Sequence, residues 1–181
     1  MGSPSLKFKH VTRAGTYHRV ADPDWPEPLD ARPALASGGR WNPPGSFPVV
    51  YLNRSVPLAR LFVANKLRGL PYGPEDLDPD SGPVLVSVEL LSGSYVDVVT
   101  DAGCASVGLP SSHPIDSSGD VVPHEACQPI GQEAWNQGEP GIACRSATHG
   151  ASRSDEEMAW FQRGRRLHAD EVEGFVDWFF G

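Results

Sequence analysis

Apolar and polar residues alternate along several short segments of the chain. Val84, Val86 and Val88 fall on one side of an extended segment, and Glu89 falls on the other. This period of two is typical of a half-buried strand, so we predict a strand over residues 83–91. We also predict a short strand over 17–21, a compact apolar strand over 48–52 and strands over 95–99 and 142–146. Weaker patterns indicate strands over 158–161 and 165–168.

Helical spacing is clearest just after the second predicted strand. Leu58, Leu61 and Phe62 stand at i, i+3 and i+4 and form one apolar face. Ser55 is suited to cap the helix, and Gly69 is suited to end it. We therefore predict a helix over 55–67, and two more over 124–136 and 170–180, the last capped by Asp170.

Long segments rich in Gly, Pro, Ser and Asp separate these elements. The chain has 19 Gly and 18 Pro among 181 residues, which favours short elements joined by many turns. We predict loops over residues 22–37, 70–82 and 100–122. The pattern contains no repeat and no linker, so a single domain over residues 1–181 is expected.

The charge balance narrows the classes of function. The net charge is −8 and the sequence pI is about 5.1, which excludes a broad nucleic-acid footprint. No apolar run approaches the ~20 residues that span a bilayer, so no membrane association is expected. The three cysteines lack a Cys-x-x-Cys pair, and a reduced, cytoplasmic setting fits them best.

Some titratable residues look like metal ligands or acid–base groups but lack partners. His124 and Cys127 have ligand-like spacing, but no second pair matches them, so we predict no metal site. The adjacent carboxylates Glu156 and Glu157 are interpreted as a solvated edge.

Two arginines and two aromatic residues are the strongest candidates for ligand binding. Arg19 lies in the predicted strand over 17–21, and Arg40 lies in a tight, Gly-led segment over 38–42. A guanidinium can fork onto phosphate oxygens. Surface ion pairs are the alternative. Trp41 and Tyr51 could stack on a nicotinamide or adenine ring, with core packing as the alternative.

Ser146 ends the predicted strand over 142–146, where its hydroxyl could hydrogen-bond a ligand. No Gly-x-Ser-x-Gly elbow surrounds it, so the sequence does not support a hydrolase nucleophile. An ordinary serine at a strand end is the alternative.

Taken in order, five segments resemble the motifs of the RES-domain family. They are a strand ending near an Arg, a Gly-Arg-Trp-Asn stretch, a Val-Tyr-Leu strand, a helix, and a late strand ending in Ser-Ala. The matching residues are 17–20, 39–42, 49–52, 55–67 and 141–147, within a range of about 16–162.

The resemblance implies an α+β fold similar to ADP-ribosyltransferases, with a split, twisted β-sheet core and short flanking helices. It implies NAD as substrate, cleaved at the nicotinamide–ribose bond by water or phosphate, and no cofactor besides. By the resemblance, Arg19, Tyr51 and Ser146 are the catalytic residues. The diphosphate would contact Arg19 and Arg40, and Trp41 and Asn42 would complete the substrate site.

One position departs from the family pattern. The family has a Glu in the helix eleven residues after the Tyr, and this chain has Phe62 there. Phe62 would line the substrate site, but a phenyl ring cannot stabilise an electron-poor ribose centre as a carboxylate does.

The departure leaves three hypotheses open. The first is an NAD-cleaving enzyme, the toxin of a toxin–antitoxin pair, with an antitoxin protein as partner. The second is a divergent transferase that uses NAD or another nucleotide. The third is a non-catalytic nucleotide-binding module. The oligomeric state is open, and a homo-oligomer is compatible with the sequence.

Overall fold

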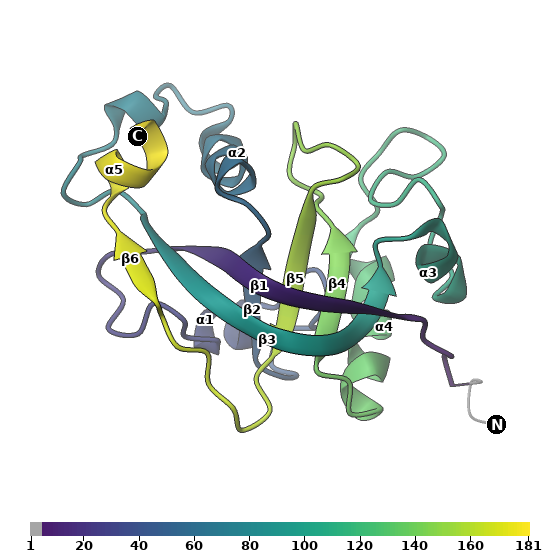
Figure 1. Ribbon diagram of the computed structural model, residues 1–181. Coiled ribbons are helices and arrows are strands. Elements are labelled where there is room, and N and C mark those ends of the chain that lie inside the picture. The colour runs from purple at the N-terminus through teal and green to yellow at the C-terminus, as the bar shows by residue number, and fades with distance from the viewer. Residues whose placement is uncertain (1–4) are drawn as a thin grey trace.

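A computed structural model describes residues 5–181, so the first four residues of the expected domain lie outside the described part. Six strands form one sheet in the order β1-β2-β5-β4-β3-β6, with β1 also paired to β3. Figure 1 shows the strongly twisted sheet with short helices around it. The strands are β1 (His10–Ala21), β2 (Val49–Asn53), β3 (Val84–Val98), β4 (Gly141–Arg145), β5 (Glu156–Phe161) and β6 (Glu171–Glu173).

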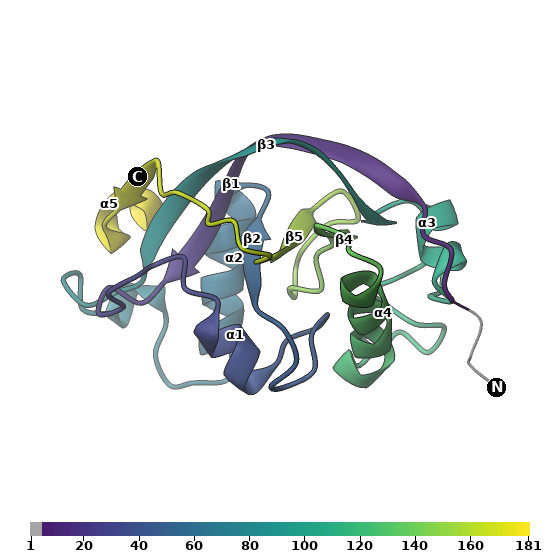
Figure 2. The ribbon, with the colours of Figure 1, turned by 90° about the horizontal axis from the view of Figure 1, so that it is seen from below.

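The two longest strands make an arched ribbon over the short central strands, as Figure 2 shows. β1 and β3 pair antiparallel from His10 opposite Val96 to Ala21 opposite Val84. The predicted strands over 83–91 and 95–99 are therefore one strand. Pairing with β1 keeps the residues between them extended.

Apolar side chains fill the space between the ribbon and the central strands. Tyr17 and Val88 from the ribbon meet Val50 and Met158 from β2 and β5 in one buried cluster. This cluster holds the ribbon against one face of β2, β5 and β4.

The other face of the central strands carries a second buried cluster, covered by α4 (His124–Asn136). Trp41 and Ile142 belong to this cluster. A Cβ placed on Gly131 would lie 1.7 Å from the Trp41 carbonyl oxygen. Glycine at this position thus lets α4 approach the backbone of the 39–42 segment.

The predicted helix over 55–67 is confirmed as α2 (Val56–Leu67) with Ser55 as its N-cap. The Ser55 hydroxyl accepts a hydrogen bond from the Leu58 amide at 3.2 Å. Ala59 and Val63 of α2 pack with Trp178 of α5 (Phe175–Phe180) in a third buried cluster.

Several predicted boundaries are wrong. The loops over 22–37 and 100–122 contain the short helices α1 (Arg32–Ser37) and α3 (Asp101–Ser106). Residues 165–168 form no strand. The helix predicted over 170–180 is instead β6 followed by α5, and Gly174, not Asp170, precedes it. Residues 171–173 pair with β3, and these inter-strand bonds override the helical spacing. A single 3₁₀ turn, η1 (Pro74–Asp76), lies in the 70–82 segment.

Candidate functional site

Polar side chains gather on the α4 side of the central strands. Glu157 of β5 lies opposite Asn53 of β2 and opposite Cys144 of β4. Residues paired across strands project from the same face, and so do residues two apart along a strand. Tyr51, two residues before Asn53, and Ser146, two residues after Cys144, therefore share the Glu157 face.

Ser146 and Glu157 are joined directly. The Ser146 hydroxyl donates to Glu157 Oε1 at 2.5 Å, and the Thr148 hydroxyl donates to the same oxygen at 3.4 Å. Burial raises the pKa of the Glu157 carboxyl, while the Ser146 hydrogen bond and the positive charge of Arg40 oppose that rise. The buried strand-end serine is thus paired with a half-buried carboxylate.

Interpreting the 156–157 pair as a solvated edge was wrong, because both residues are half-buried and Glu157 is bonded to Ser146. The Glu157 side chain follows Ala159 and Phe161 on one face of β5, and both of those are buried. Glu156 points to the other face and pairs with Arg13 at 2.8 Å. The period of two along 157–161 could have revealed this difference.

Tyr51 is held by the segment that precedes β2. Its hydroxyl donates to Asn42 Oδ1 at 2.7 Å and accepts from the Trp41 amide at 3.0 Å. Burial raises the pKa of Tyr51 well above its usual range, so the phenol stays protonated. A Cβ on Gly39 would lie 2.5 Å from the Tyr51 hydroxyl, and this close approach requires glycine there.

Trp41 and Asn42 have no exposed surface. The Trp41 indole donates to Cys144 Sγ at 3.3 Å, and the Asn42 amide donates to the Ala34 carbonyl at 2.7 Å. For Trp41, the structure places the ring in the core, which was the alternative to stacking on a ligand. Both residues hold Tyr51 in place.

Arg40 leaves part of its guanidinium unused. Nη1 donates to the Val122 carbonyl at 2.8 Å and contacts Cys127 Sγ at 3.7 Å. Nε and Nη2 make no hydrogen bond to any residue in the described range. The charge of Arg40 acts on Glu157 and Tyr51, which places it beside the polar face.

Arg19 stands apart from that network. Its side chain is 8% exposed, and Nη1 has no hydrogen-bond partner among residues 5–181. The guanidinium carbon lies 5.3 Å from the centre of the Trp25 ring. Burial lowers the pKa of Arg19 to about 10, and the negative charge of Asp30 opposes this shift. A buried cation without a partner is costly, and an anionic ligand would remove that cost.

Phe62 lies on α2 beneath Lys66, whose Nζ is 4.6 Å from the phenyl centre. Burial and the nearby charge of Arg19 lower the pKa of Lys66. Two cations thus lie close to the helix on which the family carries its carboxylate.

A groove of about 290 Å³ runs between α2 and the loop that follows Ser146. Leu61 and Asn65 line its helix side, and His149 and Gly150 line its loop side. Thr148, which contacts Glu157, directly precedes these loop residues. Ser146, Glu157 and Phe62 themselves do not line the groove.

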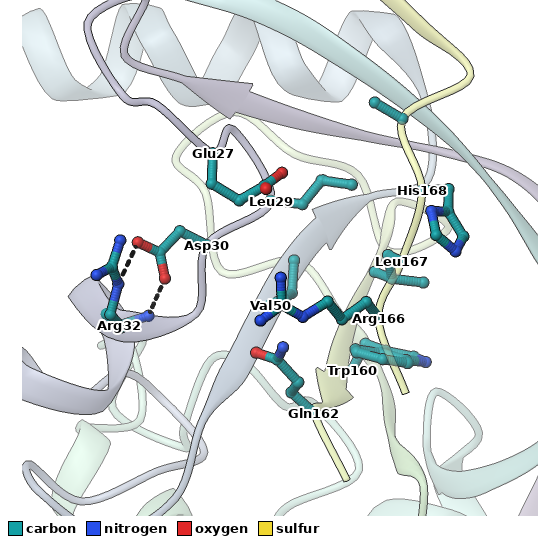
Figure 3. A pocket seen from close by; sticks show the side chains of 11 residues that line it. Glu27, Leu29, Asp30, Arg32, Val50, Trp160, Gln162, Arg166, Leu167 and His168 are labelled. Atoms are coloured by element: carbon teal, nitrogen blue, oxygen red, sulfur yellow. Dashed lines mark hydrogen bonds and ion pairs between the residues drawn. The ribbon is translucent and has the colours of Figure 1, made fainter. Parts of the chain in front are cut away.

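Figure 3 shows a larger cavity of about 620 Å³ elsewhere, in which Asp30 binds Arg32 at 2.7 Å. Val50 and Trp160 line it. Adjacent residues of a strand point to opposite faces, so this cavity opens on the face of β2 opposite Tyr51. None of the candidate site residues Arg19, Arg40, Tyr51 and Ser146 lines this larger cavity.

Within the described range, no group of three or more His, Cys, Asp or Glu side chains is placed to hold a metal ion. None of the helices in that range has the length and apolar character needed to cross a membrane.

Comparisons with known proteins agree with this architecture. The family model of the RES domain matches residues 16–177. A chain in the crystal structure of the M. tuberculosis MbcT–MbcA toxin–antitoxin complex has a similar fold, with a TM-score of 0.75 and 18% identity. The alignment covers 95% of this chain and 92% of that chain. No curated protein matches the sequence. The structural likeness confirms the predicted α+β fold class.

Proposed function

Because the chain belongs to the RES-domain family, we propose that it binds NAD and cleaves the bond between nicotinamide and ribose. Water or phosphate is the acceptor. The observation that carries the proposal is the buried, unpaired guanidinium of Arg19. A diphosphate offers the oxygens that such a group needs, in a geometry that suits its forked donors.

The remaining site residues have complementary tasks in this proposal. Arg40 presents its free Nε and Nη2 to the diphosphate, as the resemblance implies for both arginines. The ring of Tyr51 contacts the nicotinamide side, because its hydroxyl is already bonded to Asn42 and Trp41. Ser146 orients the nicotinamide ribose.

We further propose that the protein is the toxin of a toxin–antitoxin pair, with an antitoxin protein as its partner. The support is the family, together with the likeness to a chain from a toxin–antitoxin complex. Phe62 favours a second candidate, in which the domain is a divergent transferase or a non-catalytic nucleotide-binding module.

The test is incubation of the pure protein with NAD, with and without phosphate, followed by mass spectrometry. We expect nicotinamide together with ADP-ribose or its phosphorylated form. Arg19→Ala and Ser146→Ala should abolish this release, and unchanged turnover in both variants would contradict the site assignment. Intact NAD in the presence of measurable binding would favour the second candidate.

A further inference from the structure

The helix position that carries the family's carboxylate holds Phe62, whereas a carboxylate on β5, Glu157, hydrogen-bonds Ser146. We infer that Glu157 is the catalytic carboxylate of this chain and supplies the negative charge that α2 lacks. The inference rests on the proposed NAD cleavage. It assigns a role to a residue outside the five motif segments.

Glu157 lies where the reacting ribose would bind. Its Oε1 accepts hydrogen bonds from Ser146 and Thr148, and Ser146 is the residue proposed to orient that ribose. Its backbone lies between β2 and β4, in register with Asn53 and Cys144. Tyr51 and Ser146 flank it on the same face, and so it is central to the polar group.

The second carboxylate oxygen is free for a ligand. Oε2 makes no hydrogen bond to the described residues, and it is not among their sealed, unpaired polar atoms. Oε1 is fixed by two hydroxyl groups, so Oε2 is held in one orientation. A fixed acceptor of this kind needs little reorganisation when charge develops next to it.

The neighbouring Glu156 differs from Glu157 because its charge is already paired. It pairs with Arg13 through both carboxylate oxygens, at 2.8 and 2.9 Å. Glu157 has no such ion pair in the described part of the chain, and only the longer-range charge of Arg40 opposes its own. Its negative charge therefore remains available to a cationic reaction centre.

The step balances with water as acceptor. The bond between ribose C1′ and the nicotinamide nitrogen breaks, and both electrons go to the nitrogen, so nicotinamide leaves as a neutral molecule. The ribose becomes oxocarbenium-like, and Glu157 Oε2 stabilises its positive charge while accepting a hydrogen bond from a ribose hydroxyl. Water oxygen forms the new bond to C1′ and releases one proton to solvent. With phosphate, a phosphate oxygen forms that bond.

The test compares Glu157→Gln with Glu156→Gln in steady-state NAD cleavage. The amide oxygen of Gln keeps an acceptor for Ser146, so the fold should persist. We expect Glu157→Gln to lower kcat by about 100-fold with little change in KM, because the lost interaction forms mainly in the transition state. Glu156→Gln, on the opposite face, should stay within about twofold of the wild type, because its half-buried ion pair with Arg13 lies away from the polar face.

The pH profile of kcat gives an independent result. The groups that face Glu157 are Ser146 and Thr148 from the loop after β4, Cys144 from β4, and Arg40 from the segment before β2. Burial raises the pKa of the Cys144 thiol, which therefore stays protonated, so an acid limb that Glu157→Gln removes reports on Glu157. Because burial raises the pKa of Glu157, kcat should fall on the acid side with an apparent pKa above the ordinary 4.5.

The outcomes separate the two claims. A wild-type protein that leaves NAD intact contradicts the proposed function, and with it the role of Glu157. An active wild type with an equally active Glu157→Gln variant contradicts only the role of Glu157. A wild-type kcat that stays constant from neutral pH down to 4.5 overturns that role even if the variant does not fold.

Discussion

Two groups of residues include members of the family motifs. They differ in whether their buried polar atoms have hydrogen-bond partners within the protein. In the Tyr51 cluster (Arg40, Trp41, Asn42 and Tyr51), the Tyr51 hydroxyl and the Asn42 amide hydrogen-bond within the protein. In the Arg19 cluster (Arg19, Trp25, Phe62 and Lys66), the most buried cation leaves Nη1 without a partner. Apart from Nε and Nη2 of Arg40, the first cluster is complete without a ligand, and the second is not.

The difference separates scaffold from binding site. A buried network whose hydrogen bonds are all made fixes the geometry of its members. The Tyr51 cluster therefore sets the position of the Tyr51 ring and of Nε and Nη2 of Arg40. An unsatisfied buried charge lowers stability until a ligand pairs with it. A short motif can therefore contain residues of both kinds, and only their partners distinguish them.

The largest expected effect comes from breaking the Tyr51 cluster. Asn42→Ala removes the partner of the Tyr51 hydroxyl, of the Ala34 carbonyl and of the Phe47 carbonyl. With roughly 1–3 kcal/mol for each unsatisfied group, we expect a loss of about 4 kcal/mol in the free energy of unfolding, measured by urea denaturation. Asn136→Ala, at the exposed end of α4, is the control and should cost less than about 0.5 kcal/mol. Equal stability of the two variants would show that the network does not hold the cluster.

A second experiment probes an unsatisfied group beside the same cluster. His113 is fully buried, and neither ring nitrogen has a partner among the described residues. Burial, with the charges of Arg40 and Arg145, lowers the pKa of His113 from 6.5 to about 4. Below pH 6.5 the unfolded chain binds a proton that the native chain excludes, so stability falls as the pH falls from 6.5 to 4.

The shift corresponds to at most about 3 kcal/mol of pH-dependent stability. His113→Leu should remove that part of the acid sensitivity, measured as the free energy of unfolding at several pH values. His168→Leu, at an exposed position, serves as the control and should retain it. A wild-type and a His113→Leu protein with parallel pH profiles would contradict this account.

The smallest expected change in stability tests the Arg19 cluster and has the opposite sign. Arg19→Met removes a buried, unpaired charge and keeps an apolar side chain, so we expect stability to rise by about 1 kcal/mol. NAD binding, measured by calorimetry, should weaken at least about tenfold, as the loss of a charged hydrogen bond implies.

Arg60→Met is the matched control. Arg60 lies on α2 and donates twice to the Trp178 carbonyl and once to the Gly181 carbonyl. Its loss should lower stability and leave NAD binding unchanged. If both substitutions destabilise the protein to the same extent, Arg19 is a structural residue like Arg60.

The sequence predicts those parts of the molecule that local pattern determines. Apolar spacing and the Ser55 cap identify α2. A compact apolar run identifies β2, and alternation identifies the first half of β3. The continuity of β3 between the two predicted strands, and the formation of β6, depend on pairing with distant strands. Local composition does not encode that pairing. Short α1 and α3 lie within segments whose Gly, Pro and Ser content indicates loops.

The candidate site follows the same division. The motif order identifies Arg19, Arg40, Tyr51 and Ser146, but spacing cannot distinguish a satisfied arginine from an unsatisfied one. Glu157 was missed because its contact with Ser146 depends on the pairing of β4 with β5. The burial of Trp41 likewise depends on α4, which packs against it through Gly131.

A crystal structure of the protein with ADP-ribose tests the central claim most directly. The account predicts a phosphate oxygen within hydrogen-bond distance of the Arg19 guanidinium, with the terminal ribose beside Ser146. A diphosphate bound elsewhere, for example in the cavity lined by Val50 and Trp160, with Arg19 still unpaired, would contradict it.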